Sequence, residues 1–366
     1  NMYAKRLIIH NFRSYPSLEI EFPSSSVFLT GPNSSGKTNI IEAIYYLTLG
    51  RSFRKADDTN LIQRGQKEAS IYLEFYDEKD SLIHTISCVI SSKGKLFAID
   101  DEEVHKLSMI LGKLIAVCYE PSQVFFFKDE PGVRRKLLDE TLSQLYPGYL
   151  YSIGRYKKLL KERNAALSQS GDIDIINAYR NQLINVSYRI VYERKRLVLS
   201  INRIIQQIYT ELFGENEGFQ LQYKTNCPLD DDQKSFVENS IHLFESNKSL
   251  ENIRGTTLIG PHRDNLIGLI GKKPIADYGS QGENRIASLA LKFSLFHEIQ
   301  QILDRSPILL LDDVTSDLDE ERSRRILSYA EKSGQTFVTG TRLPQGLQNY
   351  TIYETSDTKS ELSRRN

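Results

Sequence analysis

One octapeptide near the start of the chain restricts the possible folds more than any other feature. It is Gly31-Pro32-Asn33-Ser34-Ser35-Gly36-Lys37-Thr38, a complete GxxxxGK[ST] sequence. An apolar segment, 27–30, precedes it, and apolar residues at helical spacing follow it over 40–47. The glycines allow successive backbone N–H groups to surround phosphate oxygens without Cβ clashes. The pattern therefore predicts a strand, a phosphate-binding loop and a helix, in preference to an ordinary Gly-Ser turn.

The residue types in this segment match the chemistry of a bound nucleoside triphosphate. Lys37 is the expected catalytic cation that reaches the β- and γ-phosphates, and the Thr38 hydroxyl is an expected ligand of Mg²⁺. The start of the following helix adds backbone N–H groups that favour an anion. The expected ATP contacts in this segment are Gly31, Pro32, Asn33, Ser34, Ser35, Gly36, Lys37, Thr38 and Asn39.

Two adjacent acids follow the most apolar run in the last third of the chain. The run 308–311 is typical of a buried parallel strand, and it ends in Asp312-Asp313. Such a strand brings its terminal carboxylate to the sheet edge where a phosphate loop also ends. We expect Asp312 to bind Mg²⁺ and Asp313 to act as the catalytic base toward the attacking water. Considered without the phosphate loop, the pair could simply cap the next helix, expected from about Glu320.

A third motif precedes another amphipathic segment. Ser280 and Glu283 form an S-x-x-E capping box, and Gly282 between them lets a ligand approach the backbone. A helix N-terminus with free N–H groups is an anion site. Helix capping alone also explains Ser280 and Glu283, so these residues by themselves leave both interpretations open.

The middle of the chain has a different character. Segment 173–213 contains neither Gly nor Pro, and its apolar residues recur three, four or seven positions apart. Asp172 or Asp174 is placed to cap its start, and Gly214 to end it. A second helical segment, 149–168, precedes it across a short polar turn. The two segments predict either an antiparallel helical arm or a compact bundle with a break near Ser187. Beyond Thr355 we expect a loose polar tail.

The order of these motifs resembles ABC-type ATPase heads of the SMC kind and, more closely, the RecF family of bacterial recombination mediators. The segments that carry the resemblance are 49–54 (Leu-Gly-Arg-Ser-Phe-Arg), 134–139 (Arg-Arg-Lys-Leu-Leu-Asp), 156–164, 260–264 (Gly-Pro-His-Arg-Asp) and 278–285 (Tyr-Gly-Ser-Gln-Gly-Glu-Asn-Arg). It implies an α/β fold, an ABC-type P-loop ATPase head with a mixed sheet and flanking helices. Residues 1–120 and 256–366 would form this discontinuous head, and 121–255 an inserted, mainly helical second domain.

The resemblance also implies a function. Members of this family form a homodimer that closes around two ATP molecules with Mg²⁺, and the closed dimer binds DNA, either duplex, gapped or at a single-strand–double-strand junction. Slow, DNA-stimulated ATP hydrolysis would then release the DNA. RecO- and RecR-like proteins are the implied partners, and together they would load a RecA-type recombinase at single-strand gaps.

Further site residues follow from the resemblance alone. Ser280, Gln281 and Gly282 would face the γ-phosphate bound by the other subunit, and Asp317 with Asp319 would form a loop that crosses the dimer interface. Thr339, with Thr341 as the alternative, stands where ABC transporters carry a switch histidine. Gln123 is a further candidate ligand of Mg²⁺.

The chain departs from the family pattern at the helix start. Gln281-Gly282-Glu283-Asn284-Arg285 replaces the usual Gln-Gly-Gln-Gln-Arg. A carboxylate at position 283 would weaken γ-phosphate capture unless it turns back to cap the helix. His262 is interpreted as an ordered structural or interdomain residue and is given no acid-base role.

Other functional classes fit less well. A transporter-coupled ABC motor conflicts with the long insertion, the absence of Leu-Ser-Gly-Gly-Gln and the missing switch histidine. An SMC-like nuclease would need a second acidic metal cluster. An inactive ATPase is disfavoured because Lys37, Asp312 and Asp313 are all present.

Charge distribution sharpens the prediction of DNA binding. The chain has 47 Lys and Arg against 47 Asp and Glu, so bulk electrostatic attraction to DNA is excluded. Residues 131–215, however, hold 14 basic against 8 acidic side chains, which is an excess of six positive charges. The clusters are Arg134-Arg135-Lys136, Lys157-Lys158 with Lys161, and Arg194-Lys195-Arg196. These clusters and 51–55 are candidate DNA contacts, although a solvated helical face is the ordinary interpretation.

The cysteines and the hydropathy of the chain indicate where in the cell the protein is located. The three cysteines, Cys88, Cys118 and Cys227, are far apart in the sequence and are typical of reduced thiols. The sequence contains no run of the roughly 18 apolar residues that a membrane span needs. We therefore expect a cytoplasmic protein with no membrane partner.

Overall fold

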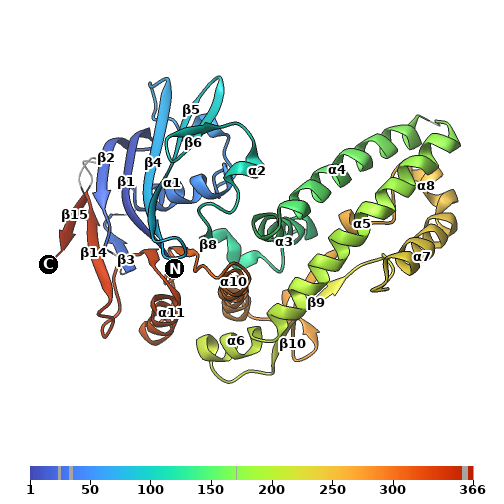
Figure 1. Cartoon of the computed structure of the whole chain (residues 1–366). Coiled ribbons are helices and arrows are strands. Elements are labelled where there is room, and N and C mark those ends of the chain that lie inside the picture. The colour runs from blue at the N-terminus through green and yellow to red at the C-terminus, as the bar shows by residue number, and fades with distance from the viewer. Residues whose placement is uncertain (24–25, 33–35, 170, 357–361, 366) are drawn as a thin grey trace. The chain divides into compact units, whose positions relative to one another are not determined.

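The computed structural model describes residues 1–23, 26–32, 36–169, 171–356 and 362–365. The chain divides into two compact units (Figure 1). The first comprises Asn1–Val124, Ile208–Glu215 and Ser288–Asn366, and the second comprises Phe125–Gln207 and Asn216–Ala287. This division differs from the expected one chiefly at 256–287, which belongs with the helical segments. The boundary falls inside helix α10 (Gln281–Leu303).

The first unit contains two six-stranded sheets. One is antiparallel, in the order β2-β1-β4-β5-β6-β7, and the other has the order β15-β14-β3-β13-β12-β8. Strands β14, β3, β13, β12 and β8 are parallel, and β15 is antiparallel to β14. The strands are β1 (Met2–Phe12), β2 (Tyr15–Glu21), β3 (Ser26–Thr30), β4 (Glu68–Asp77), β5 (Leu82–Ser91), β6 (Gly94–Ile99), β7 (Glu102–Val104), β8 (Ala116–Tyr119), β12 (Ile308–Asp312), β13 (Thr336–Thr339), β14 (Tyr350–Thr355) and β15 (Leu362–Arg365).

Helix α1 (Lys37–Leu49) packs against both of these sheets. It contacts β12, β13 and β8 of the parallel sheet and β1, β4 and β5 of the antiparallel sheet. Because α1 is covered on more than one side, almost all of its residues are buried, including the polar Lys37, Asn39 and Glu42. The remaining helices of this unit are α2 (Leu107–Ile110) and α11 (Glu320–Ser333), with most of α6 (Ile205–Phe213) and of α10.

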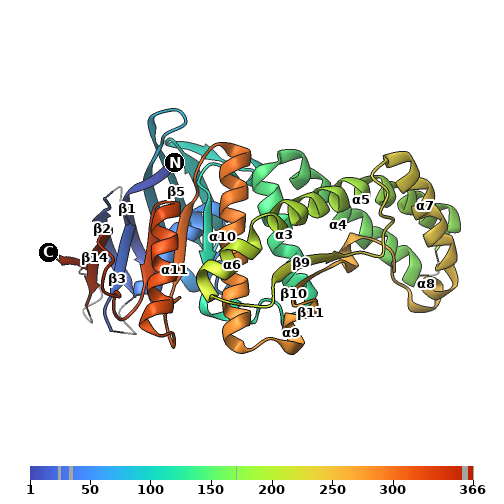
Figure 2. The ribbon, with the colours of Figure 1, turned by 90° about the horizontal axis from the view of Figure 1, so that it is seen from below.

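The second unit is mainly helical. Its helices are α3 (Pro131–Leu145), α4 (Pro147–Ser168), α5 (Ile173–Asn202), α7 (Gln233–Ser246), α8 (Lys248–Arg254) and α9 (Ile275–Tyr278). Figures 1 and 2 show α4 and α5 running alongside each other, with α7 packed on α5 and α8 on α4. A three-stranded sheet completes the unit, in the order β11-β10-β9. Its strands are β9 (Phe219–Lys224), β10 (Asn265–Ile270) and β11 (Lys273–Pro274).

The helical segments agree with the sequence at their ends but not at the expected break. The Asp172 side chain accepts a hydrogen bond from the Asp174 backbone N–H, so Asp172 is the cap. Helix α5 continues through Ser187, whose hydroxyl donates to the Leu183 carbonyl at 2.6 Å. The helix ends instead at Asn202, and α6 begins at Ile205. The helical segment expected over 173–213 is therefore two helices, and the expected break near Ser187 is wrong because the chain breaks between Asn202 and Ile205.

The C-terminal segment also differs from its prediction. Residues 362–365 form β15, which pairs with β14 in the register Ile352 to Arg365. The described part of this segment is therefore a sheet edge, where a loose tail was expected. The sequence did not indicate the strand because this segment is polar almost throughout and has no apolar alternation.

Candidate functional site

The parallel sheet brings the carboxyl ends of three strands to one edge. In register, Thr339 of β13 pairs with Asp312 of β12 on one side and with Leu29 of β3 on the other. Strand β3 leads to Gly31, and α1 begins at Lys37, so the phosphate-type loop leaves the sheet at this same edge. The strand–loop–helix arrangement and the buried strand ending in Asp312 agree with the sequence prediction.

Two hydroxyl side chains contact Asp312, which is 4% exposed. The Thr38 hydroxyl donates to Asp312 Oδ1 at 2.9 Å, and the Thr339 hydroxyl donates to the same oxygen at 2.6 Å. Thr339 Oγ1 in turn accepts from the Asp313 backbone N–H at 2.9 Å. Hydroxyl and carboxylate oxygens are the ligands that Mg²⁺ prefers, so Thr38 and Asp312 fit this ion.

Lys37 is buried, and its ammonium group is held by backbone carbonyls. Nζ donates to the Gly31 carbonyl at 2.9 Å and to the Gly340 carbonyl at 3.5 Å. Burial lowers the pKa of Lys37, while the negative charges of Asp313 and Asp312 oppose that shift. The two acids offset only part of the burial penalty on the ammonium charge, so the pKa of Lys37 stays below its ordinary value. The predicted contacts Asn33, Ser34 and Ser35 lie outside the described residues.

The other predicted residues around the loop have defined positions. Gly36 caps α1 with φ +89°, and Pro32 is an exposed residue of the loop. Asn39 lies in the first turn of α1, where its amide donates to Ser14 Oγ at 2.8 Å. Its side chain is therefore engaged by the turn between β1 and β2, a contact that the motif did not predict.

The acid after Asp312 has an unusual backbone. Asp313 has φ +53° and Asp317 has φ +61°, the left-handed region that non-glycine residues seldom adopt. Asp317 is exposed, whereas the Asp319 side chain caps α11 by accepting from the Arg322 backbone N–H at 2.7 Å. Aspartate adopts this conformation more readily than most residues, so the two values mark a tight turn after β12.

The start of α10 belongs to the second unit. The Glu283 backbone N–H donates to Ser280 Oγ at 3.1 Å, and the Ser280 backbone N–H donates to Glu283 Oε1 at 3.0 Å. This is the reciprocal capping box that the sequence predicts. Glu283 turns back onto the helix start, while Ser280 and Gln281 are exposed and Gly282 is half-buried. The Glu283 carboxylate thus accepts a hydrogen bond from a backbone N–H at the same helix end that would receive an anion.

Gln123 lies in the short helical turn Pro121–Phe125 of the first unit. Its Oε1 accepts from the Glu120 backbone N–H at 3.2 Å. The contacts found among the described residues do not join Gln123 to Thr38 or Asp312, so its role as a ligand of Mg²⁺ stays a prediction.

The basic clusters of the second unit are not all free to contact DNA. Arg194 is 2% exposed and forms a bidentate ion pair with Asp139, with Nε–Oδ1 and NH2–Oδ2 distances of 2.9 Å. Arg134 is also buried and donates to Asn265 Oδ1 and to the carbonyls of Phe126 and Asp129. The prediction that these two arginines contact DNA is wrong, because internal acceptors use their donors.

Arg135 is used internally in the same way, since it donates to the Asp264 carbonyl at 2.9 Å. Six exposed or partly exposed basic residues of the three clusters remain. They are Lys136, Lys157, Lys158, Lys161, Lys195 and Arg196.

His262 has a structural role within the second unit. Its Nε2–H donates to the Thr257 carbonyl at 2.9 Å, and its Nδ1 accepts from the Tyr156 hydroxyl at 2.6 Å. Burial lowers the pKa of His262 to about 4, so the ring is neutral at pH 7. Arg194 also donates to the Pro261 carbonyl at 2.8 Å, and the 260–264 segment is thereby fixed to α4 and α5.

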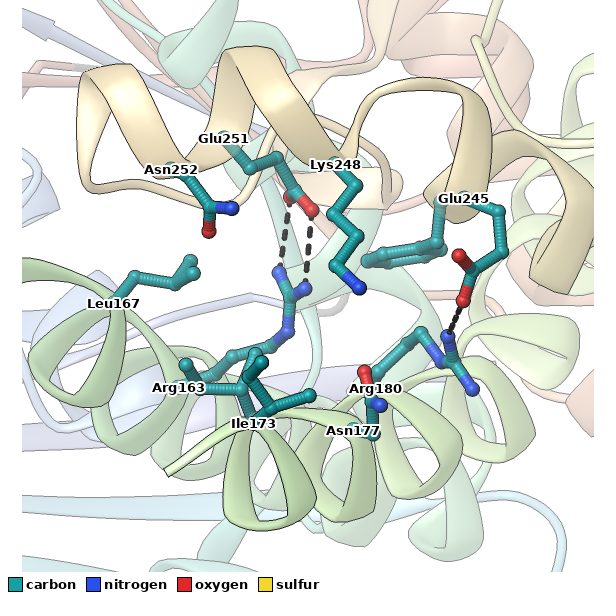
Figure 3. Close-up of a pocket in the computed structure, with 11 residues that line it drawn as sticks. Arg163, Leu167, Ile173, Asn177, Arg180, Glu245, Lys248, Glu251 and Asn252 are labelled. Carbon is teal, nitrogen blue, oxygen red and sulfur yellow. Dashed lines mark hydrogen bonds and ion pairs between the residues drawn. The ribbon is translucent and has the colours of Figure 1, made fainter. Parts of the chain in front are cut away.

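A small pocket lies between α4, α5, α7 and α8 (Figure 3). Arg163 lines it and is bound through NH1 and NH2 to Glu251 at 2.9 and 3.0 Å. Lys248 and the Arg180–Glu245 ion pair lie at its other side (Figure 3). The cavity of about 30 Å³ holds one or two water molecules and is too small for a nucleotide. The buried Arg163 Nε atom, which has no protein partner among the described residues, makes water the fitting occupant.

Membrane-spanning helices and clustered metal ligands are both absent from the described residues. None of the helices there is long and apolar enough to cross a membrane. Within the same ranges, no group of three or more His, Cys, Asp and Glu side chains is placed to hold a metal ion.

Known proteins resemble the chain over nearly its full length. The RecF/RecN/SMC N terminal domain family matches residues 3–363. A protein named DNA replication and repair protein RecF from Halalkalibacterium halodurans is 33% identical over 363 residues, with 96% of this chain and 97% of the relative covered. The protein of the same name from Oceanobacillus iheyensis is 35% identical over 361 residues, with the same coverage.

Solved structures agree with the sequence comparison. The structure of the recombination mediator protein RecF-ATP in the RecFOR pathway superposes with a TM-score of 0.89 at 25% identity, covering all of this chain and 98% of the other. The Smc head domain from Pyrococcus furiosus superposes with a TM-score of 0.60 at 17% identity, covering 97% of that chain. The chain therefore has the fold of an ABC-type ATPase head, and it belongs to the RecF family of DNA replication and repair proteins.

Proposed function

We propose that this chain is an ATP-dependent DNA-binding protein of recombinational repair that acts in the cytoplasm. ATP binding drives two copies together head to head, the closed dimer holds duplex or gapped DNA, and slow hydrolysis releases it. The observation that carries the proposal is the convergence of Lys37, Thr38, Asp312 and Thr339 at one sheet edge, where a loop with the phosphate-binding sequence also ends.

Each residue at this sheet edge has a separate role in ATP binding and hydrolysis. Lys37 exchanges its two carbonyl partners for β- and γ-phosphate oxygens, because a phosphate is the stronger acceptor for an ammonium group. Thr38 and Asp312 hold Mg²⁺, which when bound neutralises phosphate charge and orients the γ-phosphate. Asp313 accepts the proton of the attacking water. Thr339 orients Asp312 but is not basic at neutral pH, so hydrolysis is slow.

Dimerisation adds the second half of each site. Ser280, Gln281 and Gly282 face the γ-phosphate held by the other copy, and the exposed Asp317 turn lies at the interface. Support for this arrangement comes from the exposure of Ser280 and Gln281 and from the folding back of Glu283 onto the helix start. The backbone N–H groups and the dipole at the helix N-terminus would attract phosphate at this position.

RecO- and RecR-like proteins are the proposed partners, and loading of a RecA-type recombinase at single-strand gaps is the proposed outcome. The family membership and the RecFOR context of the similar ATP-bound structure support both.

Light scattering tests the dimerisation step. Wild-type protein should become dimeric with ATP and Mg²⁺ and remain monomeric with ADP. Lys37→Met removes the phosphate contact, and Ser280→Arg places a bulky side chain at the interface, so both variants should stay monomeric with ATP. A mass that ignores nucleotide and both substitutions contradicts the mechanism.

DNA binding at several salt concentrations separates the functional classes. For a switch, the affinity for duplex and gapped DNA and the slope of log affinity against log salt should both be larger with ATP than with ADP. A transporter-coupled motor would show no such DNA binding. A nuclease-associated head would cleave DNA, and this cleavage would depend on a metal ion other than the Mg²⁺ of the ATP site.

A further inference from the structure

A buried carboxylate in the helix that follows the phosphate loop joins three separate segments. Glu42 of α1 is fully buried. Arg13 binds it with both donors, Nε to Oε1 at 2.9 Å and NH2 to Oε2 at 3.0 Å. The Ser52 hydroxyl donates to Oε2 at 2.6 Å, and Arg54 Nε lies 3.6 Å from the same oxygen. Glu42 thus holds the β1–β2 turn through Arg13 and the segment after α1 through Ser52.

The β1–β2 turn that Arg13 anchors is packed directly against the end of the phosphate loop. The Tyr15 hydroxyl donates to the Gly36 carbonyl at 3.2 Å, and Ser14 Oγ accepts from the Asn39 amide at 2.8 Å. A Cβ atom at Gly36 would lie 2.8 Å from both Ser14 Oγ and the Tyr15 hydroxyl. The turn therefore forms a tightly fitted wall for the loop, and Arg13 with φ +50° fixes its course.

The segment after α1 also contacts the first turn of α1, through Arg54. The Ser52 hydroxyl accepts from the Arg54 backbone N–H at 3.0 Å, which fixes the residue that approaches Asn39. Arg54 NH2 then donates to Asn39 Oδ1 at 3.3 Å. Asn39 is thus held at both ends of its amide, by Ser14 and by Arg54, and Glu42 places both of these residues.

We propose that Glu42 is a positioning residue of the nucleotide site. Through Arg13 and Ser52 it fixes Ser14, Tyr15 and Asn39 against Gly36, and it thereby holds Gly36 and the first turn of α1 in place before a nucleotide arrives. A segment that is already held in place loses less conformational freedom when it binds a ligand, so its affinity is higher. This inference rests on the proposed ATP binding and assigns a function to residues outside the GxxxxGK[ST] sequence.

The test measures affinity for a fluorescent ATP analogue by titration. Glu42→Gln keeps the size of the side chain but removes the charge that binds Arg13, and it should weaken binding by about tenfold, the effect of removing a charge-assisted hydrogen bond. Ser14→Ala removes only the hydroxyl at the far end of the chain of contacts and should weaken binding in the same direction. Far-UV circular dichroism and the thermal midpoint of each variant show whether it is folded at the titration temperature.

The control breaks a partly exposed arginine–glutamate ion pair of β1, the strand that precedes the turn containing Arg13. Arg6 of β1 binds Glu19 and Glu74 at 2.8 Å each. Glu74→Gln removes an arginine contact of the same kind at a place not joined to the loop, so nucleotide affinity should equal that of wild type. A loss of affinity in Glu74→Gln equal to that in Glu42→Gln would overturn the inference, because disturbance of the sheet alone would then explain both.

A double-mutant cycle distinguishes positioning from general destabilisation. If Glu42 acts through Arg13 and Ser52, Glu42→Gln combined with Arg13→Met should weaken ATP binding no more than Glu42→Gln alone. Additive losses of affinity would overturn the inference. If Glu42→Gln fails to fold, Ser14→Ala and Arg13→Met decide the result, and wild-type affinity in both overturns it.

Lys37→Ala separates this inference from the proposed function. Failure of wild-type protein to bind the analogue, or unchanged binding in Lys37→Ala, contradicts the ATP site itself. Loss of binding in Lys37→Ala together with wild-type affinity in Glu42→Gln and Ser14→Ala contradicts only the role of Glu42.

Discussion

Two buried arginines of the second unit are each paired with a carboxylate, whereas a buried histidine there is not. Arg163 is paired with Glu251, and Arg194 with Asp139, so neither charge is isolated from water without compensation. His262 differs from the two arginines because it has no carboxylate partner. Its two ring nitrogens bind a hydroxyl and a carbonyl. The ring is therefore held neutral, and its protonation competes with folding.

The neutral His262 ring predicts a loss of stability in weak acid. Its folded pKa of about 4 lies below the usual value of 6.5, so between these pH values the unfolded chain binds more protons than the folded chain. The free energy of unfolding should therefore fall as the pH decreases from about 6.5 to 4, by up to about 3 kcal/mol from this group. Urea unfolding at pH 7.5 and at pH 5 measures the change.

His262→Gln provides the comparison for the pH experiment. Glutamine cannot be protonated, so the dependence of stability on pH should be shallower in this variant, although its stability at pH 7.5 is lower because the hydrogen-bond geometry differs. Other titrating groups contribute to both proteins and cancel in the difference. An equal slope in the variant and in wild type would show that His262 does not resist protonation.

Helix α5 is fixed along its length by contacts with other elements. Arg194 lies in its C-terminal third and binds Asp139 of α3, the Pro261 carbonyl and the Tyr223 hydroxyl of β9. Tyr149 of α4 donates to Asp139 Oδ1 at 2.5 Å. One guanidinium group thus joins α3, α5, β9 and the segment after Gly260, so these elements form a single packed body.

Removal of this guanidinium group should destabilise the second unit strongly. Arg194→Met leaves the buried carboxylate of Asp139 without its cation, and we expect the free energy of unfolding to fall by about 3–5 kcal/mol. Arg196→Met, two residues along the same helix but exposed, should change it by less than about 0.5 kcal/mol. Urea denaturation monitored by circular dichroism compares the two. Equal stability of the variants would contradict the structural role of Arg194.

At the scale of the whole molecule, the chain has no net charge but its insertion is basic, and part of that positive charge is held inside the fold. Three of the basic residues in 131–215, Arg134, Arg135 and Arg194, donate to internal acceptors. The exposed lysines of α4, which are Lys157, Lys158 and Lys161, keep their charge at the surface. DNA binding through the insertion would therefore depend on this lysine group.

Reversal of the α4 lysine charges tests their contact with DNA. With ATP present, Lys157→Glu/Lys158→Glu/Lys161→Glu should weaken duplex binding and lower the salt slope by about 1 for each DNA phosphate that the protein no longer neutralises. The control, Lys93→Glu/Lys234→Glu/Lys248→Glu, changes net charge equally at exposed positions elsewhere. Equal binding by the two triple variants would show that the α4 lysines have no special contact with DNA.

Several elements of the fold could be predicted because their signals are local. The loop between β3 and α1, the apolar strand that ends at Asp312, the Asp172 cap and the Ser280–Glu283 capping box depend on residues close together in sequence. The end of α5 at Asn202 could not be predicted in this way. Apolar residues continue at helical spacing into α6, and no Gly or Pro marks the break.

The amino-acid sequence by itself determined the local chemistry of this protein: a phosphate-binding loop, a carboxylate at the end of a buried strand and a capped helix start. Only the tertiary structure decided which charges face solvent and which hold the site together. Glu42, Arg13 and Ser52 carry no motif, and Arg194 looked like part of an exposed cluster. The reason is physical, because a buried charge is stable only beside a partner, and folding brings that partner from a distant part of the chain.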